Sequence, residues 1–111
     1  MLSCCVGMQD IPVLLNAFYF SGTLYGQGVY FGKDASVSLH YAKGSPGQRC
    51  MYLVRVLVGK SCQGTKDMKT PPFLNGISGK QYDSAVDLPV NPREFVIFHD
   101  TQSYPEYLIT F

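Results

Sequence analysis

The chain has 111 residues, of which 46% are hydrophobic, and this falls within the length of one ordinary domain. The formal net charge is only +1, and the nine Lys and Arg residues are scattered along the sequence. Charge therefore gives no reason to expect a nucleic acid or a membrane surface as a direct partner.

The four cysteines give no sign of a metal site. Cys4 and Cys5 are adjacent, whereas Cys50 and Cys62 are isolated. No C-x-x-C pair or Cys/His cluster therefore has the spacing of zinc ligands. We expect reduced thiols in an intracellular protein, with no bound metal.

The segment 1–21 gives the weakest structural signal. Its apolar run 11–20 is broken by Pro12 and Asn16 and predicts either a buried strand or a short helix, because periodicity cannot separate the two over so short a run. The run is too short to span a bilayer, and the segment lacks the basic start and long apolar centre of a secretory signal. We therefore expect a soluble protein of the nucleus, the cytoplasm or both.

The stretch 25–41 carries the strongest local signals. Gly26 and Gly28 allow a sharp bend or the close approach of a ligand. The β-branched and aromatic residues 29–31 predict a short strand. Asp34 is a suitable N-cap for a helix that would continue until a Gly/Ser/Pro turn stops it.

On that helix Ser38 and Tyr41 are three residues apart, so we expect them on the same face. A hydroxyl group and an aromatic ring would then lie beside the end of a strand that carries a second tyrosine, Tyr30. This arrangement suits a flat ring with an amide group, because a tyrosine can stack on the ring and a hydroxyl can hydrogen-bond its polar edge.

The stretch 50–58 alternates in the manner of a strand. One of its two faces is apolar throughout, and we expect that face to be buried. The face consists of Tyr52, Val54, Val56 and Val58.

The apolar runs 95–98 and 107–111 predict two more strands, the second one after a turn around 103–105. Between residues 60 and 93, Gly, Pro and polar residues dominate, which predicts a long loop that is either functional or disordered. We expect 82–84 to anchor its far end. Together these elements predict a mostly antiparallel α+β domain with one short helix.

The stretch 25–41 resembles the nicotinamide-pocket motif of the poly(ADP-ribose) polymerase family, in which G-x-G-V-Y-F is followed by A-S-x-S and a tyrosine. The resemblance covers roughly 22–111 and is closest to the mono-ADP-ribosylating branch. The further matching segments, in order, are 51–59, 70–72, 82–84, 94–102 and 104–111.

The resemblance implies an α+β fold of the ADP-ribosyltransferase type, with a split antiparallel β-sheet and short helices, incomplete at the N-terminus. It implies a divergent segment at 1–21 followed by the C-terminal portion of a catalytic domain at 22–111, as a monomeric domain of a larger protein. The implied reaction transfers ADP-ribose from NAD+ to side chains of acceptor proteins and releases nicotinamide, with NAD+ as cosubstrate and no metal.

The resemblance also implies roles for five residues. Glu94 matches the glutamate of the family's catalytic triad and would stabilise the oxocarbenium-like charge on the ribose. Tyr30 matches the triad tyrosine, and Tyr41 matches the tyrosine that stacks on nicotinamide. Ser38 matches the serine that bonds the carboxamide, and Gly28 would allow close approach of the backbone.

Two features depart from the family pattern. The His-Gly pair of an upstream strand has no counterpart, because the only histidines are His40 and His99, which we expect to be structural. Glu94 stands where the mono-ADP-ribosylating branch commonly carries an apolar residue, so the length of the ADP-ribose product is open. The alternative function is a catalytically inactive fragment or isoform that acts as a binding module.

Overall fold

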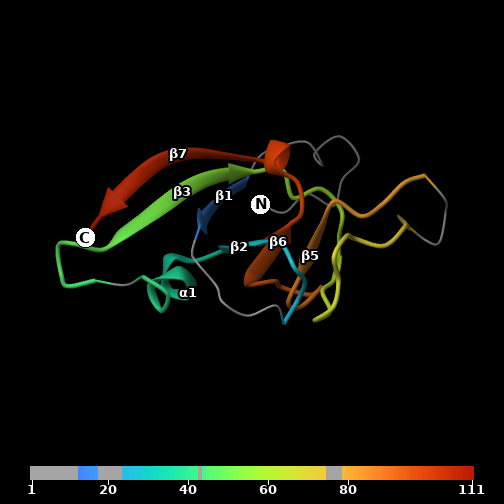
Figure 1. Cartoon of the computed structure of the whole chain (residues 1–111), viewed down its shortest axis with the longest axis horizontal. Coiled ribbons are helices and arrows are strands. Elements are labelled where there is room, and N and C mark those ends of the chain that lie inside the picture. Colours follow the sequence, from blue (N-terminus) through green and yellow to red (C-terminus); the bar gives the residue numbers. More distant parts are fainter. Residues whose placement is uncertain (1–12, 18–23, 43, 75–78) are drawn as a thin grey trace.

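The computed structural model describes residues 13–17, 24–42, 44–74 and 79–111. The strands are β1 Val13–Ala17, β2 Val29–Gly32, β3 Cys50–Val56, β4 Ser61–Gln63, β5 Ser84–Val86, β6 Glu94–Ile97 and β7 Ser103–Thr110. They form one seven-stranded sheet in the order β4-β5-β6-β2-β1-β3-β7 (Figure 1). All neighbouring strands are antiparallel except β4 and β5, which are parallel.

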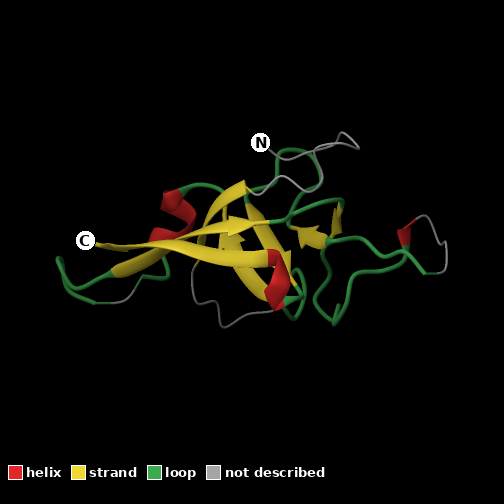
Figure 2. Cartoon of the chain, turned by 90° about the horizontal axis from the view of Figure 1, so that it is seen from above, coloured by secondary structure: helices red, strands yellow, loops and turns green. Residues whose placement is uncertain are grey.

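The named helical elements are short. They are the α-helix α1, Ala35–Leu39, and the 3-10 helix η3, Asp100–Gln102, which immediately precedes β7 (Figure 2). Among the described residues, no helix has the length and apolar character that a membrane crossing needs. The predicted α+β class, with a mostly antiparallel sheet and short helices, is confirmed.

The centre of the sheet is buried on both faces. Phe95 and Val96 are neighbours on β6, point to opposite faces and are both fully buried. Val96 packs with Tyr30 and Ala85, and we call this side the tyrosine face. The opposite side, which we call the phenylalanine face, buries Phe31, Val54, Val56, Val58, Val86, Phe95 and Ile97. Burial on both sides explains the continuous apolar run of β6, and the strand predicted there is confirmed.

The segment 13–17 forms β1, which pairs with β2 on one side and β3 on the other. Of the two alternatives for the apolar run 11–20, the strand is therefore the one found. Residues 1–12 and 18–21, including Cys4 and Cys5, lie outside the described residues. Cys50 and Cys62 are free thiols.

The strand predicted at 50–58 is confirmed as β3, but the prediction of its buried face is partly wrong. Val54 and Val56 are buried as expected, whereas the Tyr52 side chain is 49% exposed. The pairing of β3 with β7 shifts register between Leu53 and Val54. Such an irregularity changes which positions of a strand face the core: Met51 is buried before the shift, and Val54 and Val56 are buried after it.

The turn predicted around 103–105 is wrong, because these residues already belong to β7. Pro105 pairs with Val54 within the ladder. Since β7 is at the edge of the sheet, a proline can occupy it without breaking a hydrogen bond to a further strand. The change of chain direction occurs one element earlier, in η3.

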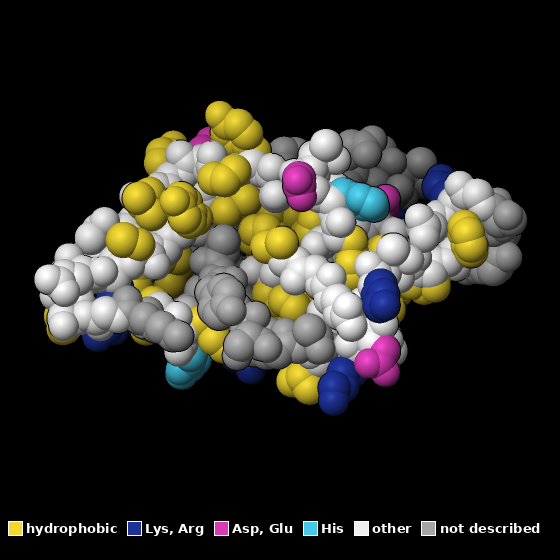
Figure 3. All heavy atoms as spheres, viewed as in Figure 1, with side chains coloured by type: hydrophobic (Ala, Val, Ile, Leu, Met, Phe, Trp, Pro, Cys, Tyr) yellow, Lys and Arg dark blue, Asp and Glu magenta, His cyan; other side chains and the backbone are white. Residues whose placement is uncertain are grey.

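Large apolar side chains are exposed along β3 and β7. In Figure 3 they gather over the part of the molecule in which these two strands lie in Figure 1. They are Tyr52, Tyr104, Tyr107, Leu108 and Ile109.

The long connection predicted at 60–93 contains β4 and β5, a parallel pair of three-residue strands that the sequence did not reveal. Its far end is anchored as predicted. Ser84 Oγ donates a hydrogen bond to the carbonyl oxygen of Val58, at 2.9 Å. Asp83 Oδ2 accepts one from the backbone N–H of Lys60, also at 2.9 Å.

Gln102 joins η3 to two other parts of the chain. Its Nε2 donates to the carbonyl oxygens of Leu57, at 3.0 Å, and Asp83, at 2.8 Å. The backbone N–H of Leu57 donates in turn to the carbonyl oxygen of Gln102, at 2.8 Å. One side chain therefore holds the end of β3, the start of β5 and η3 together.

Replacing Gln102 with Met keeps the length of the side chain but removes both donors. We expect the free energy of unfolding to fall by about 1–3 kcal/mol, because two carbonyl groups lose their partner. Urea denaturation measures the change, with Gln27→Met at an exposed position as the matched control, for which we expect about 0.5 kcal/mol or less. Equal unfolding midpoints for the two variants would show that the bridge adds no stability.

Candidate functional site

Helix α1 packs against the end of β2 through a glycine. A Cβ atom at Gly32 would lie 2.9 Å from Ser38 Oγ and 3.0 Å from Val37 Cβ, so only glycine leaves room for this contact. Gly32 and Tyr30 are two residues apart on the same strand, which places α1 on the tyrosine face. Ser38 is 1% exposed and lies directly against the strand.

The helix is shorter than predicted. Asp34 has the extended backbone of an N-cap, but its side chain makes no capping hydrogen bond. The prediction that the helix includes Tyr41 is wrong, because α1 ends at Leu39 and Tyr41 lies in the turn that follows. A five-residue helix has too few internal hydrogen bonds to persist alone, so its formation depends on packing against the sheet. The backbone N–H of Tyr41 still donates to the carbonyl oxygen of Ser38, at 3.0 Å, which keeps these two residues together.

A pocket of about 280 Å³ lies between the end of α1 and the start of β6. Glu94, the first residue of β6, pairs with Gly32 on β2, and Tyr41 enters from the turn after α1. The lining residues are Tyr25, Val37, His40, Tyr41, Asp87, Arg93 and Glu94. The structure thus brings the predicted Glu94 and Tyr41 into one pocket, whereas the buried Ser38 does not line it.

The electrostatics of this pocket centre on Glu94. Burial raises the pKa of its carboxyl group, the negative charge of Asp87 raises it further, and Arg93 acts in the opposite direction. Burial also raises the pKa of the Tyr41 hydroxyl, and the charge of Glu94 is the next cause. The pocket therefore combines an aromatic ring with a carboxyl group whose protonation depends on its neighbours.

Asp87 holds Glu94 in place, and sequence reasoning missed it. Its Oδ1 accepts hydrogen bonds from the backbone N–H groups of Arg93, at 3.0 Å, and Glu94, at 3.1 Å. Gln63 Nε2 donates to the carbonyl oxygen of Asp87, at 2.8 Å. The sequence signal that could have pointed to Asp87 is an acidic residue directly before a proline-containing turn. In the structure, Asn91 of that turn has a φ of +56°.

Tyr30 is close to this pocket but does not line it. Its ring is 3% exposed, and its hydroxyl donates to the carbonyl oxygen of Gly26, at 2.7 Å, and accepts from the backbone N–H of Tyr25, at 3.1 Å. Burial raises the pKa of this hydroxyl, whereas the hydrogen bond from Tyr25 lowers it. In this structure Tyr30 positions the loop that brings Tyr25 to the pocket, and its catalytic role stays a prediction.

Gly28 is not brought to this pocket. It directly precedes the first residue of β2, whereas Gly32, which pairs with Glu94, is the last residue of that strand. A Cβ atom at Gly28 would be 2.5 Å from the carbonyl oxygen of Ile97 and 2.8 Å from Val96 Cγ1. The absence of a side chain at Gly28 therefore allows close contact with β6. Its predicted contact with nicotinamide stays a prediction.

Besides Val37 of α1, three other lining residues were not anticipated. Tyr25 begins the glycine-containing motif, Arg93 directly precedes Glu94, and His40 follows α1. His40, which we expected to be a structural surface residue, has an exposed side chain but forms part of the pocket wall. Within the described ranges, no group of three or more His, Cys, Asp or Glu side chains is placed to hold a metal ion.

Residues 8–111 match the family described as the poly(ADP-ribose) polymerase catalytic domain. Among curated proteins, the chain is 47% identical over 95 residues to protein mono-ADP-ribosyltransferase PARP10 of Mus musculus. It is 44% identical over 90 residues to protein mono-ADP-ribosyltransferase PARP12 of Homo sapiens, and 36% identical over 110 residues to protein mono-ADP-ribosyltransferase PARP11 of Homo sapiens. Each match covers 81% of this chain but only 10%, 13% and 32% of the respective relative.

Replacing Asp87 with Asn removes a negative charge but keeps an acceptor oxygen for the two backbone N–H groups. We expect the pKa of Glu94 to fall toward its ordinary value, because the charge of Asp87 contributes to its elevation. Carbon-detected NMR titration of the Glu94 carboxyl group measures this change. Asp67→Asn, at an exposed position outside the pocket, should leave that pKa unchanged, and equal titration curves for both variants would contradict the assignment.

The same raised pKa has a consequence for stability. The folded chain holds the Glu94 proton more tightly than the unfolded chain, so the associated stabilisation is complete below the unfolded pKa and is lost as pH rises through the folded pKa. In Asp87→Asn we expect this pH-dependent loss to end at a lower pH. The free energy of unfolding in urea, measured across the acidic range, checks this prediction. A loss that ends at a higher pH in Asp87→Asn than in the unchanged chain would contradict the argument.

Proposed function

Since this chain belongs to the poly(ADP-ribose) polymerase catalytic domain family, we propose that it transfers ADP-ribose from NAD+ to protein side chains and releases nicotinamide. One structural observation supports the proposal most directly. Glu94 and Tyr41 come from motifs far apart in the sequence, and the pairing of β2 with β6 and the packing of α1 bring them into one pocket.

The proposed reaction requires negative charge beside the ribose. When the bond from ribose to nicotinamide breaks, its electron pair leaves with nicotinamide and positive charge develops on the sugar. The carboxylate of Glu94 would stabilise that charge and accept the proton of an incoming hydroxyl group as the new bond to ribose forms. Because the backbone N–H of Glu94 donates to Asp87, the backbone from which this carboxylate extends is fixed before the substrate binds.

The nicotinamide ring would stack on Tyr41. An aromatic ring at the wall of a pocket provides a flat contact surface, and Tyr25 lines the same pocket. Ser38 and Gly28 are proposed as further contacts of nicotinamide from the family resemblance, and Tyr30 as the residue that packs on the ribose side. NAD+ therefore acts as the cosubstrate, held by these residues of the chain.

The scope of the proposal follows from the relatives. The chain spans about a tenth to a third of the length of the three relatives it matches, so we propose that it acts as one domain of a larger intracellular protein, in the nucleus, the cytoplasm or both. Those relatives are named protein mono-ADP-ribosyltransferases, which supports transfer of single ADP-ribose units to proteins. They do not favour the alternative of an inactive binding module.

The catalytic role of Glu94 is tested by Glu94→Gln, with Glu106→Gln as the matched control because these are the only two glutamates of the chain. Labelled NAD+ reports transfer of ADP-ribose to protein. We expect Glu94→Gln to lower the rate by about 100-fold or more, and Glu106→Gln to leave it within about twofold. Equal rates for the unchanged chain and Glu94→Gln would exclude the proposed role, and binding of nicotinamide without any transfer would support the inactive module.

The stacking role of Tyr41 is tested by binding of 3-aminobenzamide, a nicotinamide analogue, followed by NMR. We expect Tyr41→Ala to weaken binding by about twofold to tenfold and Tyr41→Phe to retain it, because the ring and not the hydroxyl makes the contact. Tyr104→Ala, which is 69% exposed on β7, is the matched control. Unchanged affinity in Tyr41→Ala would place the analogue elsewhere.

A further inference from the structure

Strand β7 forms one of the two edges of the sheet, and its two halves differ. The first half contains Pro105, which has no N–H to donate, and the charged Glu106, and its ladder with β3 shifts register there. Proline, charge and irregular pairing are features by which natural edge strands avoid pairing with another chain. The second half, 107–111, reads Tyr-Leu-Ile-Thr-Phe and contains neither a charge nor a proline.

The backbone of this second half has groups available for a further strand. The N–H of Phe111 donates to the carbonyl oxygen of Arg49, at 2.9 Å, and the N–H of Arg49 donates to the carbonyl oxygen of Phe111, at 3.1 Å. Such reciprocal pairs occur at every second residue of an antiparallel ladder, and the register from here to Leu53 is regular. The N–H and C=O groups of Leu108 and Thr110 therefore point away from β3, out of the edge.

The side chains of this segment are exposed on both faces of the sheet. Tyr107 is 58% exposed, Leu108 56% and Ile109 43%, although consecutive residues of a strand point to opposite faces. Figure 1 shows β7 as the outermost strand, beside β3. An uncharged edge with a high proportion of β-branched and aromatic residues favours pairing with another strand.

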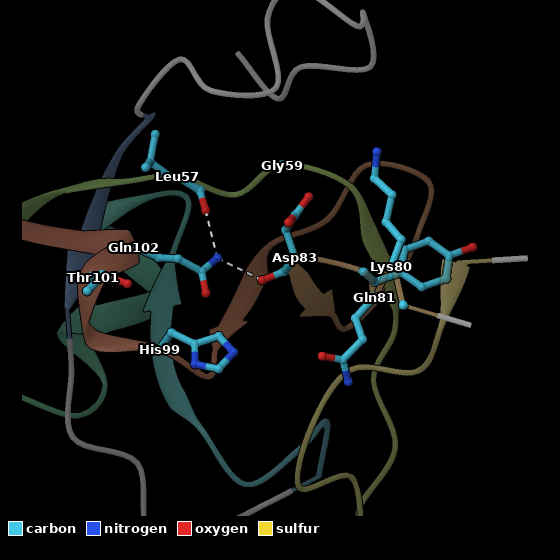
Figure 4. Close-up of a pocket in the computed structure, with 10 residues that line it drawn as sticks. Leu57, Gly59, Lys80, Gln81, Asp83, His99, Thr101 and Gln102 are labelled. Carbon is cyan, nitrogen blue, oxygen red and sulfur yellow. Dashed lines mark hydrogen bonds between the residues drawn. The ribbon is translucent and has the colours of Figure 1, made fainter. Parts of the chain in front are cut away.

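Both ends of β7 are fixed to the rest of the chain. Gln102, directly before β7, donates through Nε2 to the carbonyl oxygens of Leu57 and Asp83 (Figure 4). These residues line a second pocket, of about 430 Å³, which lies at the end of β5 and β6 opposite to the Glu94 pocket. The far end of β7 is held by the two bonds between Arg49 and Phe111. A strand that is already ordered loses little conformational freedom when it pairs.

We propose that residues 107–111 of β7 pair with the same segment of a second copy of this chain, as antiparallel strands related by a twofold axis. In the register that we assign, Ile109 lies opposite Ile109 of the second copy. Leu108 then exchanges its N–H and C=O bonds with Thr110 of the second copy, and the same exchange occurs on the other side of the axis. Glu106 stays outside this ladder.

Three observations favour a second copy as the occupant. An antiparallel pair of identical strands is self-complementary, and the segment 107–111 has no charge that would meet its like. The assigned register also places Tyr107 opposite Phe111 of the second copy, so apolar side chains meet. The other edge of the sheet, β4, has only three residues, and so the pair closes as a dimer and does not extend into a fibre.

The dimer does not depend on the proposed transferase activity, because no residue of β7 lines the Glu94 pocket. Sedimentation velocity of the 111-residue chain tests it. We expect the mass to rise from 12.3 kDa toward twice that value between about 10 µM and 1 mM, the range of a small interface.

Amide hydrogen exchange, resolved to single residues, tests which surface pairs. At about 1 mM we expect the amides of Leu108 and Thr110 to exchange about tenfold or more slowly than at about 10 µM. The amides of Tyr107 and Ile109 face β3 and should be protected at both concentrations. This measurement uses the unchanged chain and therefore holds if a variant fails to fold.

Leu108→Lys is the variant that tests the edge, with Tyr104→Lys as the matched control. Both side chains are exposed on β7 and both changes add one positive charge, but Tyr104 lies in the half before Pro105. We expect Leu108→Lys to weaken the dimer about tenfold or more, because each dimer loses two apolar contacts and gains two like charges, and Tyr104→Lys to change it less than about twofold.

Four outcomes would overturn the proposal. They are a single chain at about 1 mM, which is the monomeric state that the family resemblance implies, assemblies larger than two copies, a dimer in which the exchange of Leu108 and Thr110 is unchanged, and a folded Leu108→Lys variant that associates as tightly as the unchanged chain.

Discussion

The hydrogen bonds from the backbone N–H groups of Arg93 and Glu94 to Asp87 Oδ1 are the interaction on which the candidate site depends. They fix the chain where it enters β6, directly after the turn that follows β5. That entry point sets Glu94 opposite Gly32 in β2. Because Gly32 has no side chain, α1 can approach the strand, and the turn after α1 then brings Tyr41 to the same pocket as Glu94.

Burial of the central strands on both faces explains where polar chemistry can occur. Buried side chains such as Phe95 and Val96 occupy the two faces of the sheet at its centre. Polar side chains are instead placed at the strand ends, where the chain leaves the core. The two pockets therefore lie at opposite ends of β5 and β6, one with Glu94 and the other with Gln102.

The sequence predicted the features that are encoded locally. Short apolar runs gave β2 and β6, and the family motif gave Glu94 and Tyr41 as members of one site. The contacts that sequence could not supply depend on tertiary structure. Asp87 acts through the backbone of residues that follow a turn, and Tyr52 is exposed where the ladder of β3 and β7 changes register. Pro105 is a turn signal by residue type, and only the edge position of β7 makes it compatible with a strand.

The most direct test of the account is the position of a bound nicotinamide ring, obtained from intermolecular NOEs between its ring protons and the isotope-labelled chain. The account predicts NOEs to the ring of Tyr41 and to the side-chain protons of Glu94, because both line one pocket. NOEs confined to residues outside that pocket, such as His99 or Thr101, would contradict the claim that the pairing of β2 with β6 builds the NAD+ site.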